Sequence, residues 1–191
     1  MADVLLFHHI QGLTPGVVAF ADDLRSAGHT VHTPDLFDGR TFDSIEEGFA
    51  QTKGVDADAL ADRAVESLPA ELVYAGFSYG VGPAQRLAQT RAGARGTLLL
   101  HACYPITGEW AFGPWPEGLP VQVHGMDADP FFALEGDLDA ARELVATVGP
   151  AAELFLYPGD LHLFTDRSLP SYDEEGATLL TRRVLDFLAA I

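Results

Sequence analysis

The apolar residues of the chain gather in six short runs, separated by longer stretches that mix apolar and polar residues. Most of the runs are continuous rather than alternating, which is typical of strands buried on both faces of a parallel sheet. The expected strands are "VLLFHH" from Val4, "HTVHTPDLF" ending at Pro34, "ELVYAGF", "GTLLLHAC", "PVQVHG" and "AELFLYP".

The stretch "TPGVVAFADDLRSAG" predicts the first helix, with Thr14 as its cap, Pro15 in its first turn and Gly28 at its end. Three later segments have the same helical spacing: "DADALADRAVESL", "YGVGPAQRLAQTR" and "LDAARELVATVG". Residues 38–56 are polar and predict a loop with room for one short helix. Residues 104–119 predict a loop rich in proline, glycine and aromatic residues. The apolar face of the first helix consists of Val17, Phe20, Ala21 and Leu24.

The last helix is expected to begin near Ser171, because "SYDE" fits a capping box in which Ser171 bonds forward and Glu174 bonds back. Strands and helices therefore alternate along the chain. This order predicts a single α/β domain over residues 1–191, doubly wound, with a mostly parallel sheet of about six to seven strands and helices on both faces. The expected buried stripe of the last helix is Ala177, Leu180, Val184, Phe187 and Ile191.

The composition narrows the classes of partner and compartment. The formal net charge is -17, from 28 acidic and 11 basic residues, so the surface disfavours nucleic acid and membrane binding. Cys103 is the only cysteine, which excludes an internal disulfide. The N-terminal residues show no signal-peptide pattern and no segment reaches the length of a membrane span. We therefore expect a cytoplasmic protein.

The stretch "VYAGFSYGVG" places Ser78 between Gly76 and Gly80, directly after an expected strand and before an expected helix. This is the G-x-S-x-G pattern in the strand–turn–helix context that a nucleophile elbow requires. Such a turn strains the serine backbone, and the flanking glycines remove side chains that would clash. The N–H of Tyr79 could then face a developing oxyanion. The alternative, a nucleotide-binding turn, is disfavoured because the glycine spacing is not G-x-G-x-x-G.

A serine nucleophile needs a base and a group that orients the base, which in this fold follow in the order Ser, acid, His. Asp127 and Asp129 come after the strand "PVQVHG", and His162 follows "AELFLYP". Ser78, Asp129 and His162 are therefore the expected catalytic residues, with Asp127 as the second choice for the acid. Each residue alone also has an ordinary interpretation, for example Asp129 before Pro130 as a turn former.

These motifs together resemble the dienelactone hydrolase family of α/β-hydrolases over nearly the whole chain. The resemblance rests on the opening strand and turn, the elbow "GFSYGVG", the acid turn "HGMDADPFF" and the pairing of "TPDLFDGR" with "YPGDLHLF". It implies a compact α/β-hydrolase core without the usual first antiparallel hairpin. It also implies hydrolysis of esters or lactones, and such a hydrolase needs no cofactor.

The resemblance carries roles to individual positions. Ser78 matches the nucleophile, which is typically Cys in the family, and His162 and Asp129 match the histidine and the acid. Ile10 matches the position that supplies a second oxyanion N–H. The family often has Glu one residue earlier, where this chain has His9.

A further departure concerns the substrate. The family's dienelactone enzymes hold the substrate carboxylate with arginines, whereas the segment 38–70 here offers only Arg40, Lys53 and Arg63. Arg167 follows the histidine but is offset by one residue from the expected place. These departures predict an uncharged substrate rather than a dienelactone.

The remaining candidates concern the pocket and metals. His9, Trp110 and Trp115 are expected in the substrate pocket, and Phe112 belongs to the same loop as the two tryptophans. Ordinary surface packing of these three loop aromatics is an equal alternative. Other histidines lie near strand ends, yet none shows the spacing of a zinc site on a helix, so no metal is expected. Cys103 is expected to be a small buried hydrophobe.

The sequence therefore predicts a serine hydrolase of small ester or lactone substrates, acting through an acyl-enzyme with Ser78, His162 and Asp129. The N–H groups of Ile10 and Tyr79 are expected to bind the oxyanion. The expected assembly is a monomer or homodimer. Two alternatives remain at this point: a catalytically silent binding module with the same fold, and an acyl- or thioester-transfer enzyme.

Overall fold

A computed structural model describes residues 1–191 and contains one sheet of six strands in the order β2-β1-β3-β4-β5-β6. All five strand pairs are parallel, so the expected fold class is confirmed and the sheet has no antiparallel hairpin. The strands are β1 (Asp3–Phe7), β2 (Thr30–His32), β3 (Leu72–Phe77), β4 (Ala94–Leu100), β5 (Val121–Met126) and β6 (Ala152–Tyr157).

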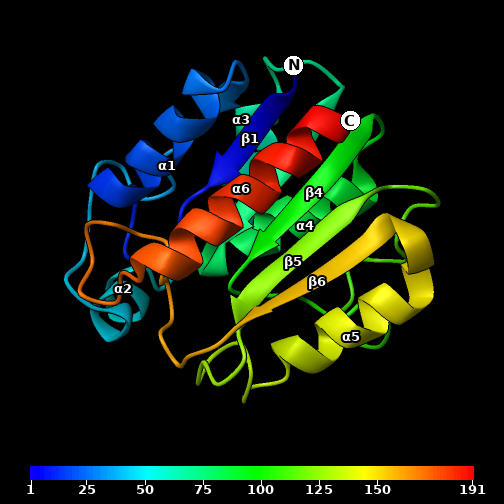
Figure 1. Cartoon of the computed structure of the whole chain (residues 1–191). Coiled ribbons are helices and arrows are strands. Elements are labelled where there is room, and N and C mark those ends of the chain that lie inside the picture. The colour runs from blue at the N-terminus through cyan, green and yellow to red at the C-terminus, as the bar shows by residue number, and fades with distance from the viewer.

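Helices cover both faces of the sheet, with α1 and α6 on one side and α3, α4 and α5 on the other (Figure 1). Each face has its own apolar core, because the parallel strands bury side chains in both directions. No helix is both long and apolar enough to cross a bilayer. The helices are α1 (Pro15–Ser26), α2 (Ile45–Gln51), α3 (Ala57–Val65), α4 (Val81–Thr90), α5 (Asp137–Val148) and α6 (Glu174–Ala190).

The strand order changes direction between β1 and β3. The chain passes from β1 outward to β2, returns to β3 on the other side of β1, and then continues outward to β6. In open α/β sheets, ligands bind outside the carboxyl ends of the strands where the order reverses. The two chain termini lie at the opposite edge of the sheet, which leaves the carboxyl edge free for a site (Figure 1).

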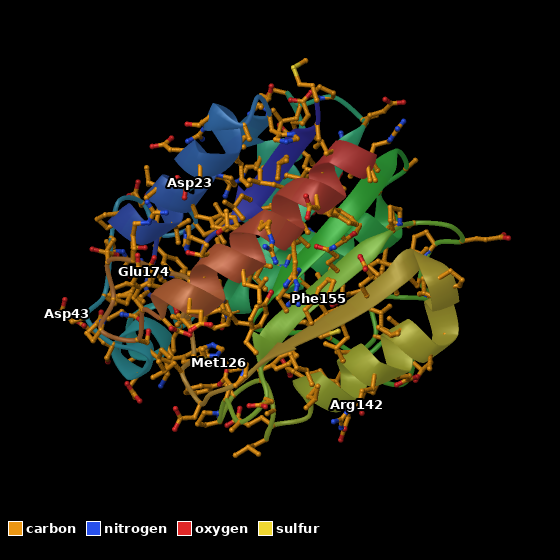
Figure 2. The ribbon with its side chains drawn as sticks, in the orientation of Figure 1. Asp23, Asp43, Met126, Arg142, Phe155 and Glu174 are labelled. Atoms are coloured by element: carbon orange, nitrogen blue, oxygen red, sulfur yellow. The ribbon has the colours of Figure 1, made fainter.

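Figure 2 shows labelled side chains at this carboxyl edge and away from it. Met126, the last residue of β5, lies there, and Glu174, the first residue of α6, lies on the same side of the molecule. Arg142 on α5 points outward into solvent and pairs with Asp139 one turn earlier. The edge that carries the strand ends is therefore distinct from the charged outer surfaces of the helices.

The helix ends test the capping expectations. Thr14 caps α1 as expected, since its hydroxyl accepts a hydrogen bond from the N–H of Val17. The expected start of the last helix at Ser171 is wrong: Asp173 is the cap, and its carboxylate accepts from the N–H of Gly176. An aspartate two residues later competes successfully with the serine because Asp and Ser are nearly equal as caps.

The polar segment 38–56 contains the short helix α2, capped by Ser44, and residues 104–119 form a loop without helix or strand. In α6 the expected stripe is buried except for Ile191, which is only partly buried and packs against the core edge. The sequence periodicity therefore located the faces of the helices better than their ends.

Gly76 and Gly80 allow the turn after β3 to pack against itself and against β1. A Cβ on Gly76 would lie 2.2 Å from the carbonyl oxygen of Gly80. A Cβ on Gly80 would lie 2.6 Å from the carbonyl oxygens of both Phe7 and His8. These contacts are with backbone atoms that no side-chain rotation can relieve, so any larger residue must move the turn.

Three of the four buried histidines at the strand ends have pKa values lowered by burial: His8 after β1, His101 after β4 and His124 within β5. Burial lowers the pKa of His8 to about 4 and that of His124 to about 3, and it holds the pKa of His101 well below 6.5. Asp137 at the start of α5 shows the opposite effect, since burial raises the pKa of its carboxyl to about 6. The folded protein therefore keeps these three imidazoles neutral.

We expect Gly76→Ala to destabilise the protein by about 3 kcal/mol or more, because its Cβ would overlap a carbonyl oxygen. Gly82→Ala, within helix α4, is the matched control: its Cβ would meet only the Tyr104 side chain, at 3.5 Å or more, which is ordinary van der Waals contact. Alanine is favoured over glycine in a helix by about 1 kcal/mol, so this control should be neutral or stabilising. Urea denaturation measures both, and equal stability of the two variants would contradict the prediction.

We expect stability to fall as the pH is lowered from about 6.5 to about 4. In that window the unfolded chain protonates three histidines that the folded chain keeps neutral, while Asp137 binds one proton in the folded state and opposes them. Unfolding near pH 5 should thus take up about two protons, which urea midpoints against pH will measure. His124→Gln should reduce this uptake by about one, and a flat profile would contradict the assignment.

Candidate active site

Ser78 adopts a left-handed backbone conformation with φ of 47°. Non-glycine residues rarely take this conformation, and strained backbone of this kind gathers at functional sites. His101 and Leu163 also have positive φ angles, 67° and 59°, and both lie near Ser78 at the carboxyl edge of the sheet. With Asp38, in the segment after β2, at a φ of 56°, all four non-glycine residues with positive φ follow the ends of strands.

The structure brings Ser78, His162 and Asp129 together, although they are far apart in the sequence. The Ser78 Oγ lies 2.8 Å from His162 Nε2, and His162 Nδ1 lies 2.6 Å from Asp129 Oδ2. Each residue follows a different strand, β3, β6 and β5 respectively. Both distances are those of hydrogen bonds, so the three side chains form one continuous chain.

The partners of His162 fix where its proton lies. Ionised Asp129 can only accept, so Nδ1 of His162 carries the proton and donates it to Oδ2. Nε2 is then free to accept the proton of the Ser78 hydroxyl. The Asp129 side chain is fully buried, and its other oxygen accepts from the N–H of Phe131, so the carboxylate cannot easily rotate away. The ring of Phe131 packs beside His162 at 4.7 Å between centroids.

Asp127, the second choice for the acid, has a different role. Its Oδ1 accepts the N–H of Gly159, which joins the end of β5 to the turn after β6. Its side chain is exposed and does not bond His162. Of the two aspartates in this turn, only Asp129 contacts the imidazole.

Ile10 and Tyr79 lie on adjacent turns, because β1 and β3 are neighbours with Phe7 paired to Gly76. Tyr79 belongs to a short 3₁₀ turn that leads into α4, where backbone N–H groups lack helical partners. The N–H of Ile10 donates no hydrogen bond within the protein, although the residue is buried. Buried N–H groups are seldom unpaired, which distinguishes the N–H of Ile10 from its neighbours.

The structure does not place the expected pocket residues together. His9 has no exposed surface; its Nε2 lies 2.8 Å from Asp166 Oδ2, in the interior beneath the turn. Trp115 is buried in the core, where its indole N–H donates to the carbonyl of Leu119. Trp110 is 75% exposed on the surface.

A hollow of about 320 Å³ lies beside the first turn of α4 instead. Its aromatic walls are Tyr79, Tyr104 and Phe112, and Asp56 and Asp58 lie at the start of α3. Tyr104 and Phe112 pack at 5.3 Å between ring centroids. Tyr79, which directly follows Ser78 in the chain, is the residue that links this hollow to the turn of the serine. Phe112 belongs to the loop that the sequence analysis assigned to the substrate pocket. Tyr104 was not predicted there, and its only sequence signal is its position after an expected strand.

The buried side chain of Gln85 holds one wall of this hollow in position. Its amide donates to the carbonyl oxygen of Tyr104 and accepts from the N–H of the same residue. These two hydrogen bonds to the backbone of one residue fix the loop after β4 against α4. The hollow is therefore built on rigid elements rather than on loop residues alone.

The basic residues do not gather at the site. Arg167 pairs with Asp23 of α1, and Arg40 bonds the carbonyl of Phe37. The structure contains no group of three or more His, Cys, Asp or Glu side chains that could hold a metal ion. Cys103 is buried, and burial raises the pKa of its thiol far above the ordinary value. A neutral buried thiol is a poor nucleophile, so Cys103 is inert.

Solved structures with the same fold include several hydrolases, all of low sequence identity. A dienelactone hydrolase-like promiscuous phosphotriesterase from metagenomic libraries is 17% identical, with a TM-score of 0.76, over 100% of this chain and 86% of that one. The protein m3DLH is 22% identical with a TM-score of 0.73, over 97% and 85%. A propionate-bound esterase from Thermogutta terrifontis is 16% identical with a TM-score of 0.64, over 99% and 82%.

Sequence comparison extends this likeness from fold to family. No functionally curated protein matches the chain. A model of the dienelactone hydrolase family matches residues 2–191, which is nearly the whole chain. The protein therefore belongs to the dienelactone hydrolase family and is an α/β hydrolase that acts on ester bonds.

Proposed function

We propose that the protein is a serine esterase for small, neutral ester or lactone substrates. The observation that carries this proposal is the hydrogen-bonded chain from Ser78 through His162 to Asp129, at 2.8 and 2.6 Å. It supplies a nucleophile, a base within hydrogen-bond reach and a group that orients the base. No cofactor is needed for this chemistry.

The reaction runs in two halves. The Ser78 Oγ attacks the substrate carbonyl carbon while His162 Nε2 takes the hydroxyl proton, and the carbonyl oxygen becomes an oxyanion. His162 then gives that proton to the leaving alcohol, the C–O bond breaks, and an acyl-serine remains. Water attacks the acyl group with His162 again as base, which releases the carboxylic acid and restores Ser78. Asp129 stabilises the imidazolium that forms in both halves.

The oxyanion is stabilised by the N–H groups of Ile10 and Tyr79. The unpaired N–H of Ile10 supports this role, as does the position of Tyr79 at the start of a helical segment. Removing one such donor typically costs about 10²–10³-fold in kcat. These donors belong to the backbone, so their placement depends on the turns that carry them.

The hollow that Tyr79 lines favours neutral substrates over anionic ones. Its walls are aromatic, and its charged residues are Asp56 and Asp58, with Arg86 held by Asp58 at 2.8 Å. No arginine lies free at the hollow to pair with a substrate carboxylate. A carboxylate-bearing lactone would therefore meet like charge there, at a cost of affinity.

We expect the protein to be labelled by a fluorophosphonate probe and to hydrolyse p-nitrophenyl acetate, and Ser78→Ala to abolish both. The hydrolysis rate of the variant should be several orders of magnitude below that of the parent, since the other groups of the site contribute only about 10³–10⁴-fold over water. Mass spectrometry should locate the label on Ser78. Folded parent protein without label would support a silent binding module instead.

The two aspartates provide a matched pair for the same assay. Asp129→Asn should lower kcat by about 10⁴-fold, because the amide can leave the histidine in the wrong tautomer. Asp127→Asn carries the same chemical change two residues away and should leave kcat within a few-fold.

Product analysis with added alcohol acceptors separates hydrolysis from acyl transfer.

We expect kcat/KM for neutral p-nitrophenyl butyrate to exceed that for the anionic mono-p-nitrophenyl ester of succinate by about tenfold or more at low salt. Asp56→Asn should narrow the gap, since asparagine keeps the cap of α3 but removes the charge. Glu71→Gln, at the opposite edge of the sheet, is the control and should leave the gap unchanged. A preference for the anionic ester would contradict the assignment of the hollow.

A further inference from the structure

Asp166 is a buried carboxylate in the loop that carries His162, four residues further along the chain. Only 3% of its surface is exposed, and both of its carboxylate oxygens accept hydrogen bonds from the protein. Oδ2 accepts from His9 Nε2 at 2.8 Å and from the Thr14 hydroxyl. Oδ1 accepts from the Ser168 hydroxyl at 2.6 Å and from the Ser168 N–H at 2.8 Å.

These partners keep the carboxylate ionised. Burial alone would raise the pKa of Asp166, but the hydrogen bonds from His9, Ser168 and Thr14 outweigh it and lower the pKa to about 2. The Thr14 hydroxyl also caps α1, so the charge lies at the positive end of that helix.

His9 connects this carboxylate to the turn that carries Ile10. Its Nδ1 accepts the backbone N–H of Gln11, so Nδ1 is unprotonated and Nε2 carries the proton that it donates to Asp166. The imidazole therefore spans two turns, with one ring nitrogen bonded to each. On one side it holds Gln11, which follows Ile10, and on the other side it holds Asp166, which belongs to the loop of His162.

The surrounding chain leaves space for this arrangement. A Cβ on Gly16 would lie 1.7 Å from Asp166 Oδ1, so only glycine at this position in α1 permits the carboxylate to sit there. The Gly16 N–H also donates to the Ser168 hydroxyl at 3.1 Å. Stability alone does not require such a group, because well-packed apolar residues often replace buried charged pairs without loss.

We propose that His9 and Asp166 are positioning residues, which act as a latch that holds the Ile10 turn at a fixed distance from the His162 loop. This inference rests on the proposed function and adds to it how the oxyanion donor and the base are kept in register. Neither side chain touches the substrate. The latch acts through the backbone N–H of Gln11 on one side and through residues 163–165 on the other.

Two substitutions at His9 separate the two links of the latch. His9→Asn keeps an acceptor near the Nδ1 position for the Gln11 N–H but loses the donor to Asp166. His9→Gln keeps a donor near the Nε2 position but loses the acceptor for Gln11. Gly16→Ala is a third, independent variant, which displaces the carboxylate while all of its hydrogen-bond partners remain.

We expect each of the three variants to lower kcat for p-nitrophenyl acetate by about 10–100-fold while KM changes less than about threefold, because a misplacement near 1 Å can cost about 10²-fold. Binding of a trifluoromethyl ketone, whose adduct resembles the tetrahedral intermediate, should weaken in parallel. All assays are run at least ~15 °C below the measured Tm of each variant.

His124→Gln is the control for the loss of a buried histidine, since His124 bonds Tyr157 and Gln122 rather than either turn. It should lower Tm without changing kcat or ketone affinity. Wild-type kcat in both His9 variants would overturn the proposal, and so would a kcat loss that leaves ketone affinity unchanged. Absence of Ser78 labelling in the parent would instead refute the proposed function and the latch with it.

Discussion

The site depends on the tight packing of the turn after β3 against the backbone around it. Gly76 and Gly80 let the chain turn so sharply that a single added Cβ would meet a carbonyl oxygen at 2.2 to 2.6 Å. The same turn forces Ser78 to a φ of 47° and leaves its hydroxyl at the carboxyl edge of the sheet. Because β1 is the neighbour of β3, the turn also lies against the segment that carries Ile10.

The site is assembled from strand ends, and its interior is held by neutral or paired polar groups. His101 packs edge-to-face against His162 at 5.9 Å and bonds Thr165 through Nε2, so a neutral imidazole supports the proposed base from behind. Asp166 remains charged in the same interior because several donors surround it. The chain therefore buries its polar groups where the turns of the site meet, at a cost that apolar packing would avoid.

Family membership indicates the fold and the type of reaction, whereas the residues of the individual site bear on the substrate. The family sets the fold and the hydrolysis of ester bonds, whereas the replacement of the usual Cys by Ser and of the usual Glu by His changes how the site is organised. In the structure His9 turns inward to Asp166, Arg167 pairs with Asp23, and Arg40 donates to the carbonyl of Phe37. The absence of an arginine from the lining of the hollow supports the proposed preference for a neutral substrate.

The sequence alone determined the fold class, the order of the elements, and Ser78 and His162 as partners, because periodicity and local turn chemistry are encoded by neighbours in the chain. It misplaced the start of α6 and assigned His9, Trp110 and Trp115 to a pocket, since neighbours do not reveal which way a loop side chain points. Only the tertiary structure decided that Asp129 rather than Asp127 reaches His162, and that His9 finds Asp166 across 157 residues. Such pairs form only when separate strand ends are brought to one edge, so their distances depend on the packing of the whole sheet.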